Sequence, residues 1–367
     1  MRQFLPREKT RTIFDVSEVG LYNIWTIIIN LESDMDIIFT EEQEMLRASA
    51  RDFLEKECTE DIIAEIEAGR LGYSPDLWRK ITELGWLGLV FPEQYGGSEM
   101  NMVDLAVLYE EFGRAAFASP YTSTIVIGGM TILEAGNKIQ KSDILPKLIE
   151  GDVIIAAILG ASDPGLEGTE LNPDDITISA MVDGEDYLLN GVKLFVHNAG
   201  IADYFLVPAR TGSGKNLEDS ITLFLVDARC PGLTITRLTT IPGDNQCEVI
   251  FDNVRIGNDS IIGKPDKGWS PLSHSMRIAE VMMSSQMLGA GERLYKDSEE
   301  DFMTRLESGI ADDIKQRNEE YLANLKQDID VCRQITYQAA NKLAEGESFN
   351  FEGSITGNWR KYTHQNA

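Results

Sequence analysis

The sequence contains few of the residues that build metal centres and disulfide frameworks. Its 367 residues include three histidines and four cysteines. The cysteines Cys58, Cys230, Cys247 and Cys332 lie far apart, without CxxC or CxxH spacing. Structural zinc sites and disulfide-stabilised folds need clustered ligands of this kind. We therefore predict no metal site, and the sparse cysteines indicate a reducing cytoplasm.

Positive charge and long apolar runs are scarce as well. The chain has 33 Lys and Arg against 60 Asp and Glu, which gives a formal net charge of -27. Such a surface repels nucleic-acid phosphates and anionic lipids, so we exclude nucleic acid and membranes as main partners. One apolar run, VGLYNIWTIII at residues 19–29, has only about half of the residues that a bilayer-spanning helix needs.

Residues 1–34 differ from the rest of the chain. Acidic residues surround their apolar run, which argues against a targeting signal, and a regular pattern opens only at Met35. We expect this N-terminal extension to be an over-long start or a disordered arm. The length of the whole chain suits two or three domains of ordinary size.

The pattern between residues 35 and 152 is helical. Thr40-Glu-Glu-Gln43 reads as a capping box, which marks the start of a helix. Pro75 opens a second helix with an apolar face. Further helical patterns cover about 103–113 and 122–135. We predict an N-terminal α-helical domain over 35–152, in which nothing indicates chemistry.

Between about residues 153 and 264 the spacing of apolar residues changes from a helical to a strand-like pattern. Six short runs of β-branched and aromatic residues alternate with turns rich in Gly, Pro, Asn and Asp. The runs are ITISAMV, YLLNGVKLFV, DYFLVPA, ITLFLVDA, LTITRL and CEVIFDNVRI. So many strands in so short a stretch predict an antiparallel β-barrel or sandwich domain over 153–264.

Helical patterns return from about Pro271 and predict a C-terminal helical domain over 265–367. The longest spans roughly 312–345, with a continuous apolar face from Leu322 to Leu343. At 1.5 Å per residue this helix is about 50 Å long, a length typical of helices that pack against another subunit. The predicted fold class is therefore α+β and multidomain, in the order helical, β, helical.

Several short motifs succeed one another along the chain. They are GWLGLVFPEQYGG at 85–97, EEFGR at 110–114, YLLNGVK at 187–193, FLVD at 224–227 and FDNVR at 251–255. In this order and at these spacings they resemble the acyl-CoA dehydrogenase family of FAD-dependent flavoenzymes. The resemblance implies α,β-dehydrogenation of an acyl-CoA in fatty acid metabolism, by α-proton abstraction and hydride transfer to FAD. It also implies a tetramer that passes electrons to an electron-transferring flavoprotein.

The resemblance places a flavin site near the end of the strand that begins at about residue 187. Phe195 stands where the family has an aromatic residue that shields the isoalloxazine ring. His197 stands where the family often has a Thr or Ser that donates a hydrogen bond near flavin N5. An imidazole can also donate, and a positive charge there would favour anionic reduced flavin. The alternative for His197 is a strand end that faces solvent.

Four further residues have weaker counterparts in the family. Ser162 corresponds to the start of a turn that holds flavin and thioester, although Leu166-Glu167 replaces the small residues of that turn. Arg277 corresponds to an arginine near the CoA moiety, and the alternative is an ordinary surface arginine. Arg305 and Gln316 correspond to residues that reach the FAD pyrophosphate or adenine across a subunit boundary. Acidic residues outnumber basic ones around them, which favours a solvated acidic segment instead.

The catalytic base stays unassigned. The family carries a carboxylate just before the arginine matched by Arg277, where this chain has Met276, and a thioether cannot take a proton. The other family position lies after the last long helix, and the chain ends at Ala367 within a segment similar to the one before it. Two hypotheses remain. The chain is an acyl-CoA dehydrogenase whose C-terminal helical bundle is incomplete, or it is a non-catalytic, dehydrogenase-like subunit that binds FAD or acyl-CoA in a heteromer with a related subunit.

Overall fold

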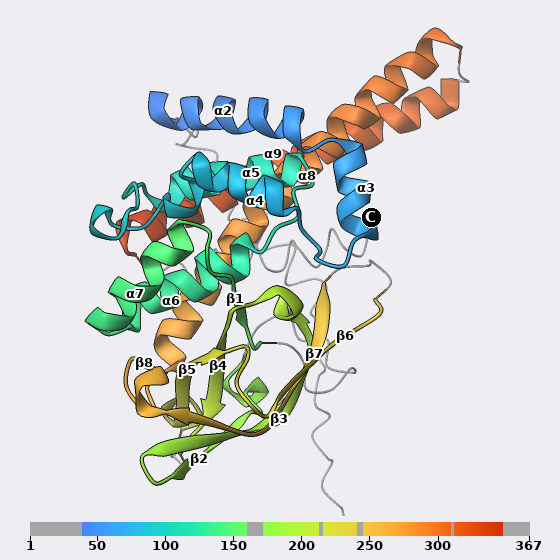
Figure 1. Ribbon diagram of the computed structural model, residues 1–367. Helices are drawn as coiled ribbons and strands as arrows, with labels where there is room; N and C mark the ends of the chain where they lie inside the picture. Colours follow the sequence, from blue (N-terminus) through green and yellow to red (C-terminus); the bar gives the residue numbers. More distant parts are fainter. Residues whose placement is uncertain (1–38, 160–171, 213–215, 241–244, 310–311, 348–367) are drawn as a thin grey trace, which may run out of the picture. The chain divides into compact units, whose positions relative to one another are not determined.

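The computed structural model describes residues 39–159, 172–212, 216–240, 245–309 and 312–347. The elements come in the order helical, β, helical (Figure 1), which confirms the predicted fold class. In these described ranges, no helix has both the length and the apolar character to cross a membrane. The predicted extension at residues 1–34 lies outside them.

Several helices before the sheet start or end at capping residues that the sequence provides. The helices in this part are α2 (Glu41–Glu57), α3 (Glu60–Ala68), α4 (Pro75–Glu83), α5 (Met102–Arg114), α6 (Met130–Ala135) and α7 (Lys138–Ile149), with the 3₁₀ turns η1 (Trp86–Gly88) and η2 (Glu93–Tyr95) and the π-helix η3 (Thr122–Gly129). Ser74 caps α4 by accepting a hydrogen bond from the Leu77 amide, and Gly85 comes after its end with a φ of 76°. Asn101 and Asp104 form a capping box at the start of α5. The helices predicted near residues 75 and 103 are confirmed.

Helix α5 is buried along most of its length and carries one side of an aromatic cluster. We use this name for Tyr109, Phe112, Phe117 and Tyr121. Their ring centroids lie 4.9 Å apart for Phe112 and Phe117 and 5.6 Å apart for Tyr109 and Tyr121, distances at which aromatic rings attract one another. The two buried phenols are hydrogen-bonded: Tyr121 donates to the Trp86 carbonyl at 2.7 Å, and the Tyr109 oxygen lies 2.9 Å from Thr122 Oγ1. These ring contacts and hydrogen bonds hold the side chains of the aromatic cluster in fixed positions.

The middle part forms one mainly antiparallel sheet. Its strands are β1 (Ile155–Ala157), β2 (Ser179–Asp183), β3 (Asp186–His197), β4 (Tyr204–Arg210), β5 (Ile221–Asp227), β6 (Leu233–Arg237), β7 (Gln246–Gly257) and β8 (Ile261–Ile262). The order is β6-β7-β3-β2-β4-β5-β8, and β1 pairs in parallel with β4. The six runs predicted as strands are β2 to β7. Alternate side chains from these strands, including Phe205, Phe224 and Phe251, share one apolar core.

The end of β3 leaves the regular pairing. Its register with β7 shifts between Lys193 and Val196, and Phe195, inside that shift, has a φ of 57°. Asn198, just past the strand, has a φ of 62°. Its backbone N–H donates a hydrogen bond to the backbone carbonyl of Asn245 at 2.9 Å. Left-handed backbone is uncommon for residues with a side chain, and bulges of this kind often re-aim side chains beside active sites.

Two long helices come after the sheet, α8 (Trp269–Glu307) and α9 (Asp312–Glu345). The bounds of α9 confirm the helix predicted at 312–345. Helix α8 crosses α5 with the two backbones in contact: a Cβ added at Gly113 would lie 1.6 Å from the Gln286 carbonyl oxygen, and one at Gly289 would lie 1.8 Å from the Glu110 carbonyl oxygen. Only glycine permits this approach. The end of α8 and the start of α9 extend together away from the sheet (Figure 1, orange and red).

A buried ion-pair cluster joins α2, α5, α8 and α9. It comprises Arg51, Glu110, Glu111, Glu292, Arg333 and Tyr337. Glu110 and Glu111 are only 2% and 1% exposed. Arg51 donates two hydrogen bonds to Glu111, at 2.6 and 3.0 Å. Arg333 pairs with both Glu110 and Glu292, and Tyr337 donates to Glu110 at 2.5 Å. Buried carboxylates require such partners, so this cluster fixes how the four helices meet.

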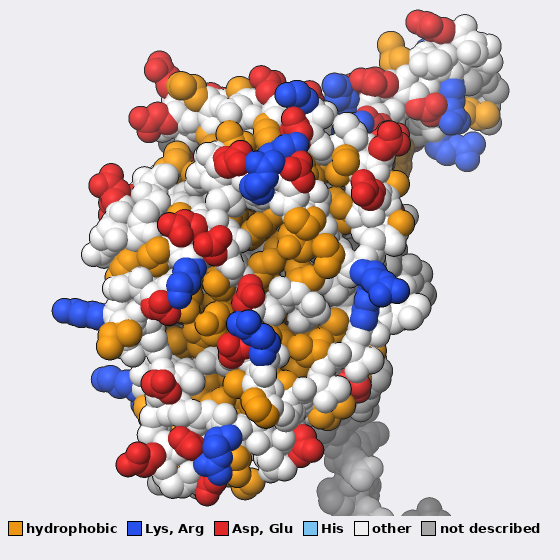
Figure 2. Space-filling view, in the orientation of Figure 1, with side chains coloured by type: hydrophobic (Ala, Val, Ile, Leu, Met, Phe, Trp, Pro, Cys, Tyr) orange, Lys and Arg blue, Asp and Glu red, His pale blue; other side chains and the backbone are white. Residues whose placement is uncertain are grey.

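The surface view shows where charge and apolar side chains gather. In Figure 2, acidic side chains are scattered over the helical part at the top of this face, in agreement with the net charge of -27. Apolar side chains gather in the middle of the face, between the helices and the sheet. The molecule thus places its less polar surface near the junction of its helical and β parts.

Candidate functional site

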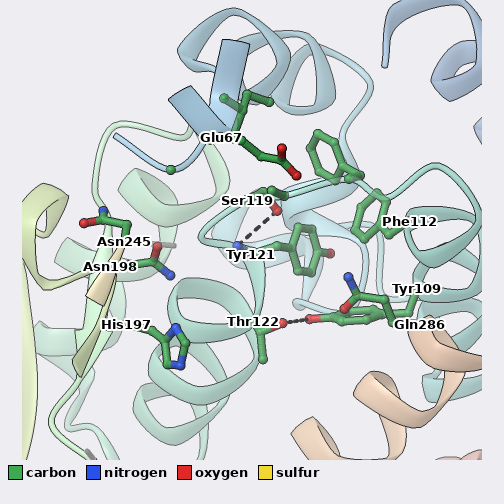
Figure 3. Close-up of a pocket in the computed structure, with 14 residues that line it drawn as sticks. Glu67, Tyr109, Phe112, Ser119, Tyr121, Thr122, His197, Asn198, Asn245 and Gln286 are labelled. Carbon is green, nitrogen blue, oxygen red and sulfur yellow. Dashed lines mark hydrogen bonds between the residues drawn. The ribbon is translucent and has the colours of Figure 1, made fainter. Parts of the chain in front are cut away.

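A cavity of about 320 Å³ lies where the helices meet the end of β3. Its lining comprises the aromatic cluster with Ala118, Ser119 and Thr122, then Ile66, Glu67 and Gly72 from α3 and the loop after it, His197, Asn198 and Asn245, and Gln286 of α8. Figure 3 shows His197 and Asn198 on one side of the cavity, and Gln286 on the other, beside Tyr109 and Phe112. All three parts of the fold therefore contribute to one cavity.

The helical wall of the cavity is neutral and rigid. Burial raises the pKa of both Tyr109 and Tyr121 well above the ordinary value of a phenol, so both stay protonated across the physiological range. Thr122, which pairs with Tyr109, begins the π-helix η3. Short π-helical turns often occur at functional sites because they offset the side chains beyond them. This wall supplies packing surface and a neutral hydroxyl pair, but no charge.

The wall at the end of β3 is held by side-chain amides. Asn198 donates to Ser123 Oγ at 3.2 Å, and Asn245 donates to the Leu71 carbonyl at 2.8 Å. His197 is exposed, and its Nε2 lies 3.3 Å from Nε2 of Gln246. These bonds tie the end of β3 to η3, and the residue before β7 to the loop after α3. An imidazole edge is thereby presented to the cavity on a fixed support.

Two lining side chains have no such support. Neither the Gln286 amide nor the Glu67 carboxylate makes a hydrogen bond or ion pair with any residue that the structure describes. Gln286 is partly buried, whereas Glu67 is exposed. Both therefore face the cavity with hydrogen-bonding capacity to spare.

The structure separates the two residues predicted to face the flavin. His197 lines the cavity, whereas Phe195, two residues earlier, is 37% exposed and is not part of the lining. Phe195 lies within the irregular part of β3 and is partly exposed, although a large apolar side chain is normally buried. Ser162 falls outside the described residues, as does the replaced pair Leu166-Glu167.

The predicted residues on the C-terminal helices lie away from the cavity. Arg277, on the first half of α8, is partly buried and makes no hydrogen bond or ion pair with a described residue. Arg305 is exposed and pairs with Asp301 at 2.8 Å. Gln316 is exposed on α9 and donates to Glu320 at 3.0 Å. Arg305 and Gln316 both belong to the extending ends of α8 and α9.

The catalytic base stays unassigned among the described residues. Met276 stands before Arg277 on α8, and Glu292 is bound to Arg333. Among the described residues of the lining, Glu67 alone carries a carboxylate. It is exposed, and it stands at neither of the two family positions for the base.

The sequence reasoning missed the residues that shape the cavity. Tyr109 reads as one more apolar position of a helix, and Gln286 as one of many polar positions. A signal was available in Gly113 and Gly289, because a glycine inside a helical pattern often marks a close approach of two backbones. Their pairing across α5 and α8 required the tertiary structure.

Comparisons with known proteins agree with these observations. The chain matches the family models of the acyl-CoA dehydrogenase N-terminal domain over residues 40–152 and of the middle domain over residues 159–254. An acyl-CoA dehydrogenase of Bacillus subtilis (strain 168) is 28% identical over 324 residues, which cover 86% of this chain and 83% of that protein. The acryloyl-CoA reductase (NADH) of Anaerotignum propionicum is 27% identical over 327 residues, 88% of this chain and 81% of that protein.

A solved structure shows the same fold. Butyryl-CoA dehydrogenase from Megasphaera elsdenii has a TM-score of 0.76 and 26% identity, with 88% of this chain and 84% of that chain covered. The two family models together match more than half of the residues. The chain therefore belongs to the acyl-CoA dehydrogenase family.

Proposed function

We propose that this chain is an FAD-dependent acyl-CoA dehydrogenase of fatty acid metabolism that removes hydrogen from Cα and Cβ of an acyl-CoA thioester. It acts in the cytoplasm as a tetramer, and an electron-transferring flavoprotein accepts the electrons. The observation that carries the proposal is the cavity between the end of β3 and the aromatic cluster. It offers a space of acyl size, lined by aromatic and polar side chains, beside His197, the residue matched to the flavin contact of the family.

The residues near the end of β3 fit a flavin. When bound, FAD would supply the hydride acceptor. Phe195 presents a partly exposed ring, and a planar tricyclic group would cover it. The His197 imidazole can donate a hydrogen bond or carry a positive charge, both of which stabilise negative charge on a reduced flavin. Ser162, which the family resemblance matches to a flavin contact, lies outside the described residues.

Arg305 and Gln316 would serve a neighbouring copy rather than their own cavity. They lie on the exposed ends of α8 and α9, where a second subunit can approach. A guanidinium binds a pyrophosphate through two charge-assisted hydrogen bonds. Arg305 must exchange its bond to Asp301 for that contact.

Arg277 is the residue we assign to the CoA moiety. It is a partly buried cation without a described partner, in a chain where acids outnumber bases almost two to one. An unpaired guanidinium of this kind favours a phosphate ligand. Its position on the first half of α8 places it on the helix that also brings Gln286 to the cavity.

The alternative function is a non-catalytic subunit that binds FAD or acyl-CoA within a heteromer. Met276, which stands at one of the family's two positions for the base, favours it. The exposed Glu67 does not replace the missing carboxylate. The alternative needs only one of the two sites, for FAD or for acyl-CoA, and it involves no turnover.

One anaerobic titration tests both functions. The purified protein is expected to carry a visible flavin spectrum, and a dehydrogenase loses that spectrum as a matching acyl-CoA reduces the flavin. A non-catalytic subunit with both sites shifts its flavin bands with acyl-CoA but does not bleach. A protein that binds neither FAD after reconstitution nor acyl-CoA would contradict both.

A further inference from the structure

We propose that the cavity selects a short acyl group with a neutral hydrogen-bonding substituent, a hydroxyl above all, and that Gln286 is the residue that recognises this substituent. The inference rests on the proposed function, because it takes the cavity as the acyl pocket. It adds a substrate class and a specificity-determining residue. The reasons are the fixed position of Gln286, its unpaired amide, the closed aromatic wall and the charge of the lining.

The crossing of α5 and α8 fixes Gln286. The Gln286 carbonyl oxygen lies so close to Gly113 that a Cβ there would be 1.6 Å away. A second contact, between Gly289 and the Glu110 carbonyl, lies three residues further along α8. The α8 backbone therefore has no room to move toward α5, and the ion-pair cluster holds the helices together. The Gln286 side chain points into the cavity beside Phe112 and Tyr109 (Figure 3).

The amide of Gln286 gives the cavity a requirement for a polar ligand. It has no hydrogen bond to a described residue. A plain alkyl chain packed against the amide would shield it from solvent and leave it unsatisfied, which is unfavourable. A hydroxyl both donates and accepts, and an amide does the same, so the two groups match.

The aromatic cluster limits the length of the acyl group. Phe112 and Phe117 are 2% and 3% exposed, and their centroids are 4.9 Å apart. Tyr109 and Tyr121 are held by hydrogen bonds to Thr122 and to the Trp86 carbonyl. The wall behind the cavity thus has no loose side chain to swing aside. A volume of about 320 Å³ is at the lower end of the range for ligand pockets.

The charge of the lining excludes an acidic substituent. None of the described residues that line the cavity is Lys or Arg, and Glu67 adds a carboxylate. Among the described residues of the lining, only the His197 side chain can become positively charged. His197 lies on the wall that we assign to the flavin. A terminal carboxylate on the acyl group would meet repulsion from Glu67 without a compensating cation. The favoured substituent is therefore neutral.

Calorimetric titration of the FAD-loaded protein tests the inference with matched acyl-CoA pairs. The pairs are butyryl-CoA with ω-hydroxybutyryl-CoA and hexanoyl-CoA with ω-hydroxyhexanoyl-CoA, and succinyl-CoA is the acidic member. In at least one pair the hydroxylated member is expected to bind about tenfold more tightly. Succinyl-CoA is expected to bind most weakly. Binding is the readout, so the result does not depend on turnover.

Variants of Gln286 separate this inference from the proposed function. Gln286→Leu is expected to abolish the preference for the hydroxylated member. If the leucine variant does not fold, Gln286→Met, whose side chain is about as long as that of glutamine, takes its place. Gln327→Leu makes the same change at an exposed position of α9 and should keep the preference. Equal affinities within both pairs, or a preference that survives loss of the amide, would overturn the inference. Absence of binding by every acyl-CoA would instead refute the proposed function.

Discussion

Phe195 holds a backbone conformation that is costly for a residue with a side chain. Its φ of 57° falls in the left-handed region, where a non-glycine residue loses about 1–3 kcal/mol. Burial offsets that loss only in part, because the residue is 37% exposed. The conformation is imposed by the register shift between Lys193 and Val196. A strained, exposed aromatic residue next to the cavity is best explained as a surface kept for a ligand.

Substitution Phe195→Gly tests that explanation. Glycine removes the left-handed strain but adds disorder to the unfolded chain, so the flavin-free protein should stay within about 1 kcal/mol of its original stability in urea unfolding. A phenylalanine that served the core would instead lose about 3–5 kcal/mol. Flavin affinity, measured by fluorescence quenching, should fall about tenfold, since stacking on an aromatic side chain contributes about 1–3 kcal/mol.

Asn253→Gly is the matched control for this prediction. Asn253 also has a left-handed φ, of 52°, and lies in β7. It is not part of the cavity lining. The variant should relieve similar strain without changing flavin affinity. Equal loss of affinity in both variants would mean that the sheet, and not the Phe195 ring, is responsible.

The candidate site was only partly predictable from single residues. Phe195 and His197 were proposed as flavin contacts because their position in a motif resembles the family pattern. That His197 lines the cavity and Phe195 does not was not predicted, because it depends on the register of β3 against β7. Gln286 and Tyr109 gave no signal of their own. Their roles arise from a cavity that several separate segments enclose, which no local pattern encodes.

At the scale of elements, the sequence was a better guide. The helix predicted at 312–345 is α9, and the six predicted strands are β2 to β7. The spacing of apolar residues and the capping residues are local features, so they can be recognised in the sequence without the tertiary structure. The strands β1 and β8 were missed because each is three residues or shorter. The crossing of α5 and α8 was missed because it pairs glycines that are far apart along the chain.

The crossing leads to a prediction about Gly289. Substitution Gly289→Ala would place a Cβ 1.8 Å from the Glu110 carbonyl oxygen, and backbone atoms have little freedom to withdraw. The helices must separate, so the free energy of unfolding in urea should fall by about 3 kcal/mol. Acyl-CoA affinity should fall as well, since Gln286 moves with α8.

Gly291→Ala provides the control on the same helix. A Cβ at Gly291 would meet only Ile329 Cγ1, at 3.8 Å, which is an ordinary contact. Alanine is the better helix former, so this variant should gain about 0.5–1 kcal/mol. If both alanine variants changed stability in the same direction, the close crossing of α5 and α8 would be wrong.

At the scale of the whole molecule, the buried phenols link stability to pH. Burial raises the pKa of Tyr109, Tyr121 and Tyr337, and for Tyr337 the neighbouring Glu110 adds to the effect. Burial likewise raises the pKa of the Cys332 thiol. Lys193 acts in the opposite direction, because its burial lowers its pKa. These residues belong to all three parts of the fold, so alkaline pH should act on the entire structure.

The sign of the tyrosine effect comes from proton counting. Above about pH 10 the unfolded chain releases the three phenolic protons and the folded chain keeps them. The folded state then binds more protons, so the free energy of unfolding decreases as pH rises. Each tyrosine contributes about 1.4 kcal/mol per pH unit. The stabilisation is complete below about pH 10 and is lost progressively above it.

Comparing two variants isolates this contribution from the thiols and Lys193. In urea unfolding between about pH 10 and 12, Tyr109→Phe should reduce the downward slope by about 1.4 kcal/mol per pH unit, because one phenol no longer ionises on unfolding. Thr122→Val removes the same hydrogen bond but keeps the phenol, so it should lower stability at every pH and leave the slope unchanged. If Tyr109→Phe kept the original slope, Tyr109 would have to ionise equally in the folded and unfolded chain. Its burial in the wall of the cavity, on which the proposed acyl pocket depends, would then be wrong.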